Sequence, residues 1–145
     1  MIIRIANASD ALELQKLNDL FNGEGCNRAD DIKNSLENNN LEIVCVAEDK
    51  KKLIGFCCGQ TFCSMCYKNC QGEITELFIL ETYRRKGIAK RLTDLMETEF
   101  LKKGVENIRV LTGGDNVVAQ NFYKSCQYEE TNEMMLEKDL IINKG

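Results

Sequence analysis

The stretch from Glu73 to Gly104 constrains the fold more than any other part of this chain. It begins with an apolar run typical of a β-strand, continues through a basic turn that holds one glycine, and ends in a long amphipathic segment typical of a helix. The apolar run contains Ile74, Leu77, Phe78, Ile79 and Leu80, and the turn is Arg84, Arg85, Lys86, Gly87, Ile88, Ala89 and Lys90. The pattern predicts a strand, an anion-binding turn and a helix, in that order.

The basic turn suits a phosphate group for two physical reasons. A helix that starts near Gly87 leaves its first amide groups without partners in the helix, and its dipole puts partial positive charge at the same end. Gly87 also lets the main chain approach a ligand without an intervening side chain. A Walker loop would end in Gly-Lys-Ser/Thr and the dinucleotide-binding motif needs three glycines, so neither matches. The turn therefore predicts a pyrophosphate site of another type.

Length and composition indicate one globular domain, residues 1–145. The chain has 145 residues, of which 43% are hydrophobic and 29% charged, and this composition excludes a disordered or fibrous chain. The net charge of −4 argues against a nucleic-acid-binding protein, because such proteins contact many phosphates with lysine and arginine. The longest apolar runs are too short to cross a bilayer, so we expect no membrane partner.

The N-terminal residues and the cysteines indicate a cytoplasmic protein. Residues 1–5 lead directly into a strand-like pattern and lack the long apolar core of a secretory signal. The eight cysteines of an intracellular chain are expected to be reduced, and disulfides are the weaker interpretation. Cys45, Cys57 and Cys58 lie within apolar strand patterns, where cysteine behaves as a small hydrophobic residue.

The rest of the chain alternates between strand and helix patterns. Residues 2–5 form a short strand, and the helical spacing of apolar residues after it predicts a helix that ends near Gly23, with Leu14, Leu17, Leu20 and Phe21 on one face. The strands at 41–48 and 53–60 are joined by a charged turn and form an antiparallel hairpin. The other predicted elements are a helix at about 29–38, a strand within 105–111, a short helix carrying Val118, Ala119, Phe122 and Tyr123, and weaker strands at 128–130 and 134–138.

The motif Arg84-x-x-Gly87-x-Ala89, directly after a strand, resembles the acyl-CoA pyrophosphate loop of the GNAT superfamily of N-acetyltransferases. The order of the predicted elements resembles the fold of that family over essentially the whole chain. The resemblance implies an α/β (α+β) fold whose central sheet is mixed, mostly antiparallel and built of about six to seven strands, flanked by about four helices. It also implies that the sheet is splayed after its fourth strand and that the acyl-CoA lies in the splay.

The resemblance implies acetyl-CoA as the co-substrate and assigns residues to it. Its pyrophosphate is expected on the turn Arg84–Lys90. Main-chain groups of Phe78 and Ile79 are expected to pair with the pantetheine arm, and a main-chain N–H there to polarise the thioester carbonyl. Asn116 is expected to contact the pantetheine, because the segment from Asn116 to Tyr123 resembles the family segment in which an asparagine does so.

Two side chains are candidates for the proton transfers of acetyl transfer. The resemblance implies that Tyr123 protonates the leaving thiolate as general acid, although a tyrosine on a short helix is also a common packing residue. Glu76 is the candidate base for the incoming amine, because it lies two residues before Phe78 and so shares its strand face near the expected thioester. The substitutes for Glu76 are Glu24, Glu73 and Glu81.

The sequence departs from the family after the last helix. Gln127 stands where relatives usually carry a glycine, in the segment Ser125-Cys126-Gln127-Tyr128. A glycine there commonly takes a positive φ, which glutamine adopts only at some cost. The helix is therefore expected to end differently, with an effect on the placement of Tyr123.

A cysteine-bearing loop offers a different chemistry. The chain has no histidine, which excludes a Ser-His-Asp triad, a Cys-His pair and a histidine-metal site. Cys63, Cys66 and Cys70 have a spacing similar to that of metal ligands, but no fourth ligand is evident. We expect reduced thiols and no metal, and a structural zinc site is the alternative.

The expected activity is the transfer of an acetyl group from acetyl-CoA to a primary amine by direct attack in a ternary complex. The acceptor is a small amine, an aminoglycoside-like amine or an amino group of a peptide or protein, and the resemblance implies acceptor loops at 21–28 and 61–72. A non-catalytic CoA-binding regulatory module is the alternative, and a metal-sensing protein is a third interpretation. No nucleic-acid partner is expected, and a homodimer is left open.

Overall fold

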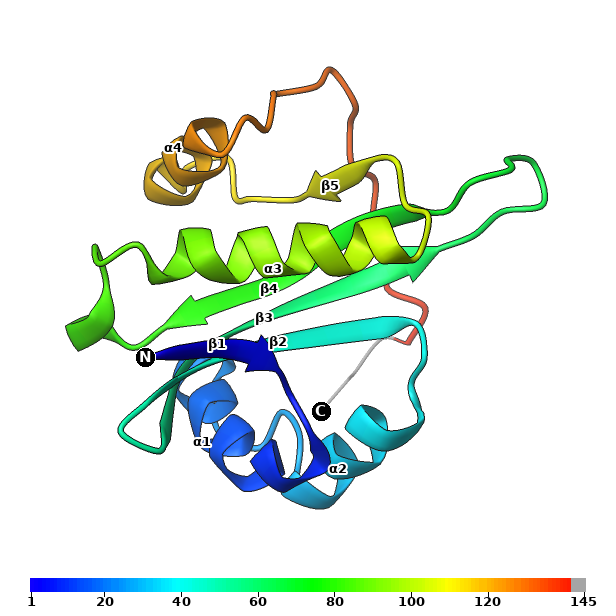
Figure 1. The fold of residues 1–145 in the computed structure, drawn as a ribbon. Helices are drawn as coiled ribbons and strands as arrows, with labels where there is room; N and C mark the ends of the chain where they lie inside the picture. Colours follow the sequence, from blue (N-terminus) through cyan, green and yellow to red (C-terminus); the bar gives the residue numbers. More distant parts are fainter. Residues whose placement is uncertain (142–145) are drawn as a thin grey trace. The chain divides into compact units, whose positions relative to one another are not determined.

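The computed structural model describes residues 1–141, which fall into two compact units, one of residues 1–111 and one that begins at Thr112. The first unit contains β1 (Ile2–Ile5), the 3₁₀ turn η1 (Ala8–Asp10), α1 (Ala11–Asn22), α2 (Ala29–Asn38), β2 (Glu42–Asp49), β3 (Lys52–Phe62), β4 (Gln71–Ile79), η2 (Glu81–Tyr83), α3 (Ile88–Lys102) and β5 (Ile108–Val110) (Figure 1). The second unit contains α4 (Val117–Ser125). Among the described residues, no helix is both long enough and apolar enough to span a membrane.

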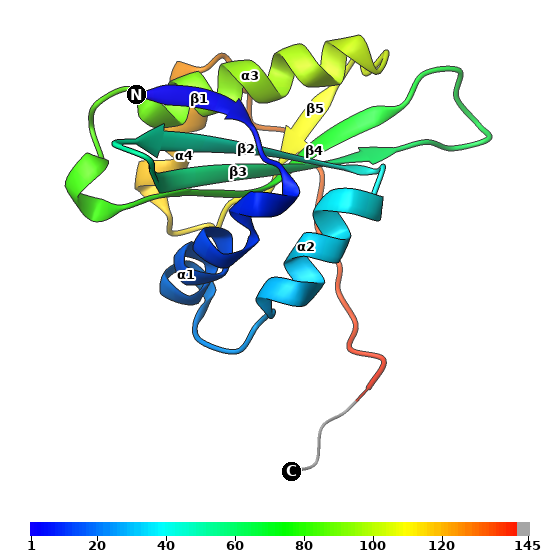
Figure 2. The same cartoon turned by 60° about the horizontal axis from the view of Figure 1, so that its bottom comes forward.

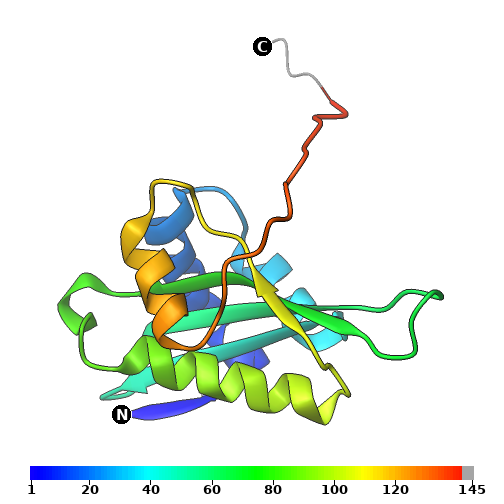
Figure 3. The ribbon, with the colours of Figure 1, turned by 90° about the horizontal axis from the view of Figure 1, so that it is seen from above.

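The strands of the first unit form one sheet in the order β1-β2-β3-β4-β5. The first three pairings are antiparallel, and β4 pairs with β5 in parallel. Helices α1 and α2 cover one face of this sheet, and α3 covers the other (Figure 2). β5 pairs only with residues 72–74 of β4 (Figure 3), so the sheet opens along the rest of β4. This is the predicted mixed, mostly antiparallel fold with a splay after the fourth strand.

The sheet has five strands, fewer than the six to seven predicted. The segments 128–130 and 134–138, which were predicted as weak strands, lie in the described part of the second unit and form no strand. A strand is stable when it pairs with a neighbour and buries one face, but Met134, Met135 and Leu136 are all exposed. Apolar content without a pairing partner is not sufficient for a strand.

The sheet face under α1 and α2 holds an apolar core. The buried residues of this core are Leu14, Leu17, Val46, Leu53 and Phe56. The ring of Phe78 on β4 stacks on that of Phe21 on α1, with centroids 5.0 Å apart. Leu20, which was predicted on the same helical face as Leu14 and Leu17, is exposed instead, and Phe21 is the residue of that turn that packs on the sheet.

The opposite face of the sheet packs tightly against α3. Met96 and Phe100 of α3 are completely buried. A Cβ at Gly59 of β3 would lie 2.6 Å from Sδ of Met96 and 2.7 Å from Cζ of Phe100, so the close approach requires glycine. Cys45 and Cys57 are buried in this face, and burial raises the pKa of the Cys45 thiol to about 12. Both act as small hydrophobic residues, as predicted.

A β-bulge at Thr75 changes the face to which the residues of β4 point. Gly59 pairs with Ile74 and Cys58 pairs with Glu76, so Thr75 is an extra residue on β4. Directly opposed residues share a face, and therefore Ile74 lies on the α3 side with Gly59, whereas Glu76 lies on the other side with Cys58. The Thr75 hydroxyl donates to O of Cys58 at 3.3 Å. The bulge is what turns Glu76 toward α1 and α2.

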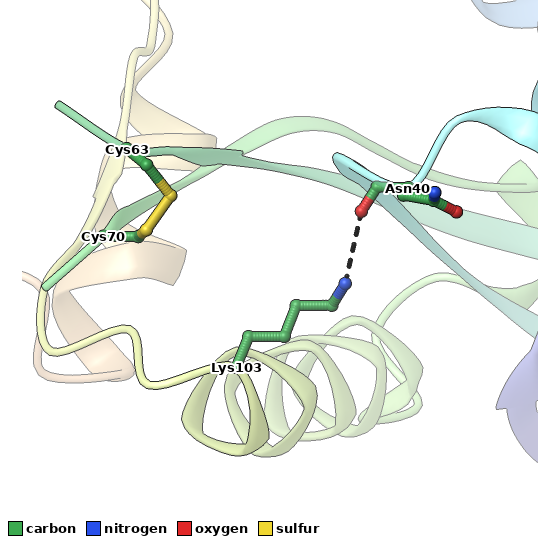
Figure 4. Close-up of a disulfide and its surroundings, with 4 residues drawn as sticks. All are labelled: Asn40, Cys63, Cys70 and Lys103. Carbon is green, nitrogen blue, oxygen red and sulfur yellow. Dashed lines mark hydrogen bonds between the residues drawn. A yellow bond between two sulfur atoms is a disulfide. The ribbon is translucent and has the colours of Figure 1, made fainter.

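The β3–β4 hairpin is closed by a disulfide between Cys63 and Cys70 (Figure 4). The prediction that these two cysteines are reduced is wrong, because the strand pairing that ends at Phe62 and Gln71 brings their Cα atoms to 4.4 Å, within reach of a disulfide. Cys66, between them, is a free and exposed thiol. Two of the three sulfur atoms considered for zinc are thus bonded to each other, and the described residues contain no cluster of three side chains suited to a metal ion.

A mostly buried ion pair joins β1 to η1. Arg4 donates from Nη1 to Oδ2 of Asp10 and from Nη2 to Oδ1, each at 2.8 Å. Asp10 is 5% exposed and also accepts a hydrogen bond from the main-chain N–H of Asn7 at 2.8 Å. The hydrogen-bonded Arg4 guanidinium lowers the pKa of Asp10 below its usual range.

Replacing Asp10 with asparagine should lower the free energy of unfolding by about 2 kcal/mol at neutral pH, because a charge-assisted pair is lost. Since the folded-state pKa of Asp10 is lowered, this stabilisation is complete above about pH 4 and is lost as the pH falls through the folded-state pKa. Urea unfolding across that pH range should therefore show that the difference in free energy of unfolding between wild type and Asp10→Asn becomes smaller in acid. Asp139→Asn, at an exposed position, is the control. A difference in free energy of unfolding that stays constant as the pH falls would contradict this role of the ion pair.

Candidate active site

The turn between β4 and α3 has the form of an anion site. Gly87 is the N-cap of α3 with a φ of +78°, a left-handed conformation that glycine adopts without strain, and Arg85 has a φ of +62°. Within the described residues, the N-cap makes no side-chain hydrogen bond, and nothing lies within 4 Å of a Cβ built on Gly87. The main chain at Gly87 is therefore accessible to a ligand at the positive end of the helix dipole.

Two hydrogen bonds hold this turn against the sheet, and one further contact lies within the connection. Nε of Arg84 donates to O of Ile79 at 2.9 Å, and the Tyr83 hydroxyl donates to Oδ2 of Asp49 at 2.8 Å. Nζ of Lys86 lies 5.4 Å from the centre of the Tyr83 ring. Arg84, the first residue of the predicted motif, thus fixes the turn to the end of β4.

A cleft of about 310 Å³ lies between α1, α2 and the sheet. Its lining residues are Leu14, Asn18, Asn22, Cys26, Asn27, Ile32, Ser35, Leu36, Glu42, Val44, Phe56, Cys58 and Glu76. Neither lysine nor arginine is among them. Of the two loops expected around the acceptor, residues 21–28 contribute to this lining and residues 61–72 do not. The cleft is therefore apolar at its floor, polar along α1 and acidic on the sheet.

Glu76 reaches this cleft from β4 and is half-buried. It lies opposite Cys58, which also lines the cleft. Phe78 packs on the same side of the sheet against Phe56, with ring centroids 6.1 Å apart. The prediction that Glu76 and Phe78 share a face is confirmed. Burial raises the pKa of Glu76 above its usual range, which makes this carboxylate a better proton acceptor.

Glu42 is a second carboxylate in the cleft, and the sequence analysis did not identify it. Burial raises the pKa of Glu42, and the negative charge of Glu76 raises it further, against the effect of hydrogen bonds from Ser35 and Gln60. Nε2 of Gln60 donates to Oε2 of Glu42 at 3.2 Å. A charged residue directly before the apolar run 43–47 was the local signal for this residue.

The carboxylates considered as substitutes for Glu76 lie elsewhere. Oε1 of Glu73 pairs with Nε of Arg109 at 2.8 Å. Glu24 and Glu81 are exposed on a loop and on η2. None of the three lines the cleft, so the structure brings only Glu76 of the four candidates into it.

Main-chain groups at the end of β4 alternate between β3 and the open edge of the strand. The N–H of Leu80 donates to O of Ile54 on β3 at 2.9 Å. Because successive residues of a strand direct these groups to opposite sides, Ile79 faces the open edge and Phe78 faces β3. Of the two residues expected to pair with the pantetheine, Ile79 alone presents its N–H at that edge.

Asn116 and Tyr123 belong to the second unit. Oδ1 of Asn116 accepts from the N–H of Ala119 at 3.1 Å and caps α4. The ring of Tyr123 packs edge-on against that of Tyr128, with centroids 5.5 Å apart. Gln127 has a φ of +67°, so α4 ends in the conformation that a glycine would adopt there, and the expectation of a different end is wrong.

The sequence was compared with family models and with curated proteins. It matches the model of the acetyltransferase (GNAT) family over residues 11–128, from the start of α1 to a point just after α4. It is 30% identical over 128 residues to an uncharacterised N-acetyltransferase of Chlorobaculum tepidum, and this alignment covers 88% of the chain and 75% of the relative.

The fold was compared with solved structures. An aminoglycoside acetyltransferase from an uncultured soil metagenomic sample, solved in complex with sisomicin, has a TM-score of 0.84 at 20% identity, over 97% of this chain and 96% of that chain. The structure of AAC(6')-Iy in complex with the bisubstrate analogue CoA-S-monomethyl-acetylneamine has a TM-score of 0.83 at 18% identity, over 97% and 98% of the two chains. At these identities the likeness establishes a shared fold.

Proposed function

Because this chain belongs to the acetyltransferase (GNAT) family, we propose that it transfers the acetyl group of acetyl-CoA to a primary amine that enters the cleft under α1 and α2. The amine attacks directly in a ternary complex. The observation that carries this proposal is the half-buried Glu76 at the cleft, on the strand that leads directly into the turn Arg84–Lys90. A proton acceptor for the amine and a site for the cofactor phosphates are thus joined by one short segment.

The residues present fit acetyl-CoA. The turn Arg84–Lys90 offers main-chain amides at a helix N-terminus, an accessible Gly87 and four cationic side chains among its seven residues, all of which suit a pyrophosphate. The open edge of β4 suits an extended pantetheine arm in the manner of an added strand, with the N–H of Ile79 left for the carbonyl of its thioester. We assign Asn116 a further contact with that arm, on the resemblance of its segment to the family.

The chain supplies two proton transfers in this scheme. Bound acetyl-CoA supplies the thioester, whose C–S bond breaks as the C–N bond of the product amide forms. Glu76 accepts a proton from the ammonium group so that the nitrogen lone pair can attack. The N–H of Ile79 donates to the carbonyl oxygen as negative charge develops on it. The Tyr123 hydroxyl donates a proton to the departing sulfur.

Replacing Glu76 with glutamine should lower kcat/KM for the amine about tenfold at neutral pH and by less at alkaline pH, where the amine loses its own proton. In the wild type, the rate should fall in acid below a pH that lies above the ordinary glutamate pKa of about 4.3, because burial raises the pKa of Glu76 and only its ionised form accepts a proton. Paired pH–rate profiles measure both effects. Glu73→Gln, on the same strand but outside the cleft, is the matched control. An equal loss at every pH would assign Glu76 to binding or folding instead.

An acceptor panel tests the function itself. Purified protein is incubated with acetyl-CoA and an alkylamine, an alkyl diamine, sisomicin or a peptide with a free amino terminus, and released CoA thiol is counted against a blank without acceptor. We expect thiol release with at least one amine, together with an acetylated product by mass spectrometry. Tight acetyl-CoA binding without thiol release from any amine would favour a CoA-binding regulatory module.

A further inference from the structure

The acceptor cleft contains one more charged group than acetyl transfer to a simple amine requires. Glu42 begins β2, and Glu76 lies on β4, with β3 between them. The register pairs Val44 with Cys58 and Cys58 with Glu76, so Glu42 is offset from Glu76 by two strands and two residues on the same face. Strand geometry then separates the two Cα atoms by about 12 Å.

No cation among residues 1–141 pairs with either carboxylate of this pair. No lysine or arginine is among the residues that line the cleft. The contacts that orient Glu42 come from the amide of Gln60 and the hydroxyl of Ser35, both neutral. Both carboxylates are half-buried, and partial removal from water without a cation is unfavourable, which makes the cleft complementary to positive charge.

Glu42 also borders a smaller cavity of about 200 Å³ that Lys103 and Glu99 line. Nζ of Lys103 donates to O of Asn40 at 3.3 Å (Figure 4). Lys103 makes no ion pair with Glu42 among the described residues, and Glu99 pairs with Lys102 at 3.0 Å. This second cavity therefore does not neutralise the cleft.

We propose that Glu42 is a specificity-determining residue that binds a second ammonium group of the acceptor, so that the preferred acceptors are diamines whose amino groups are separated by a flexible alkyl spacer. One amino group reacts near Glu76, and the other is anchored at Glu42. Val44 and Cys58 form an apolar floor between Glu42 and Glu76, which suits the methylene groups of the spacer. This inference rests on the proposed function and specifies its acceptor class.

The test compares diaminobutane and diaminohexane with butylamine and hexylamine, each with saturating acetyl-CoA. The wild type should prefer the diamine over the monoamine of equal length by about tenfold to a hundredfold in kcat/KM, mainly through KM, because one charge-assisted contact is added. Glu42→Gln keeps the shape of the side chain and should reduce this preference toward one. Glu37→Gln, at an exposed position on the neighbouring α2, should retain it.

Two results would overturn the proposal: a wild type without a diamine preference, or a Glu42→Gln variant in which the preference is intact. The first result is measured on the wild type alone, so it decides the proposal even where Glu42→Gln impairs folding. If no amine releases CoA thiol, the proposed function fails. The assignment of Glu42 is then decided by calorimetry, which compares the binding of diaminohexane and hexylamine to the wild type and to Glu42→Gln. A binding preference that the substitution abolishes supports it, and the absence of one overturns it.

Discussion

Replacing Gly87 with aspartate should weaken acetyl-CoA binding by about a hundredfold or more. The φ of +78° at Gly87 costs a residue with a side chain about 1–2 kcal/mol, and the new carboxylate would face the phosphates at the N-terminus of α3. Open space around a Cβ at this position means that the side chain would occupy the volume proposed for the ligand. Calorimetric titration of the folded variant with acetyl-CoA measures the loss.

Two further variants separate charge from backbone strain. Gly87→Asn has almost the same shape as Gly87→Asp and a similar tolerance of the left-handed conformation but no charge, so its loss of affinity should be clearly smaller. Gly104→Asp introduces the same residue at a glycine with a φ of +76° beyond the other end of α3, and it should leave acetyl-CoA affinity unchanged. Wild-type affinity in a folded Gly87→Asp protein would remove the turn from the cofactor site.

Replacing Tyr123 with phenylalanine should lower turnover between about tenfold and a thousandfold while acetyl-CoA affinity stays the same. The substitution removes only the hydroxyl, so the edge-on ring contact with Tyr128 is retained. Raising the pH should not restore activity, because the missing proton is needed by the leaving sulfur rather than removed from the amine. Steady-state kinetics across pH, with the best acceptor from the panel, provide the measurement.

Tyr128→Phe is the matched control for Tyr123→Phe, since it deletes a hydroxyl from the other ring of the same contact. Its turnover should stay close to that of the wild type. If Tyr123→Phe retains full turnover at every pH, the thiolate leaves without help from this residue, and water supplies the proton. The two proton-transfer residues thus differ in their pH dependence, because only the Glu76→Gln defect diminishes as the ammonium group loses its proton to solvent at high pH.

Local patterns predicted most of the helices and strands, because helical and strand periodicity depend on residues close in sequence. Leu14 and Leu17 face the core from α1 as their spacing required. Gly104, with a φ of +76°, follows the end of α3 as predicted. The turn at Gly87 and the strand residue Glu76 were found for the same reason, since one contiguous segment holds both.

Features that depend on pairing between strands could not be predicted from local patterns. The bulge at Thr75 left one trace in the sequence. Ile74 and Leu77 are three residues apart, yet both lie opposite β3 residues that face α3. The Cys63–Cys70 bond required the hairpin register, which the sequence did not define. Glu42 is brought near Glu76 only by the pairing of β2 with β3 and of β3 with β4. The position of one carboxylate in the sequence therefore does not indicate the other.

The prediction of a strand from apolar residues alone was also wrong. Residues 134–138 have the composition of an edge strand, but pairing and burial decide whether such a segment is extended in a sheet. The proton-transfer role of Tyr123 stays a prediction for a related reason. Its residue type and helical context can be read locally, whereas its distance from the reacting atoms depends on tertiary structure.

The strict alternation along β3 has a consequence for how this enzyme can change over time. Phe56 and Cys58 face the acceptor cleft, whereas Cys57 and Gly59 lie under α3. The cleft lining and the packing under α3 are thereby encoded in interleaved but separate sets of positions, although Phe56 also belongs to the core under α1 and α2. A mutant library confined to half-buried lining positions such as Cys58 can explore new acceptors without repacking α3 or the core, so drift in selectivity need not be limited by the stability margin of the fold.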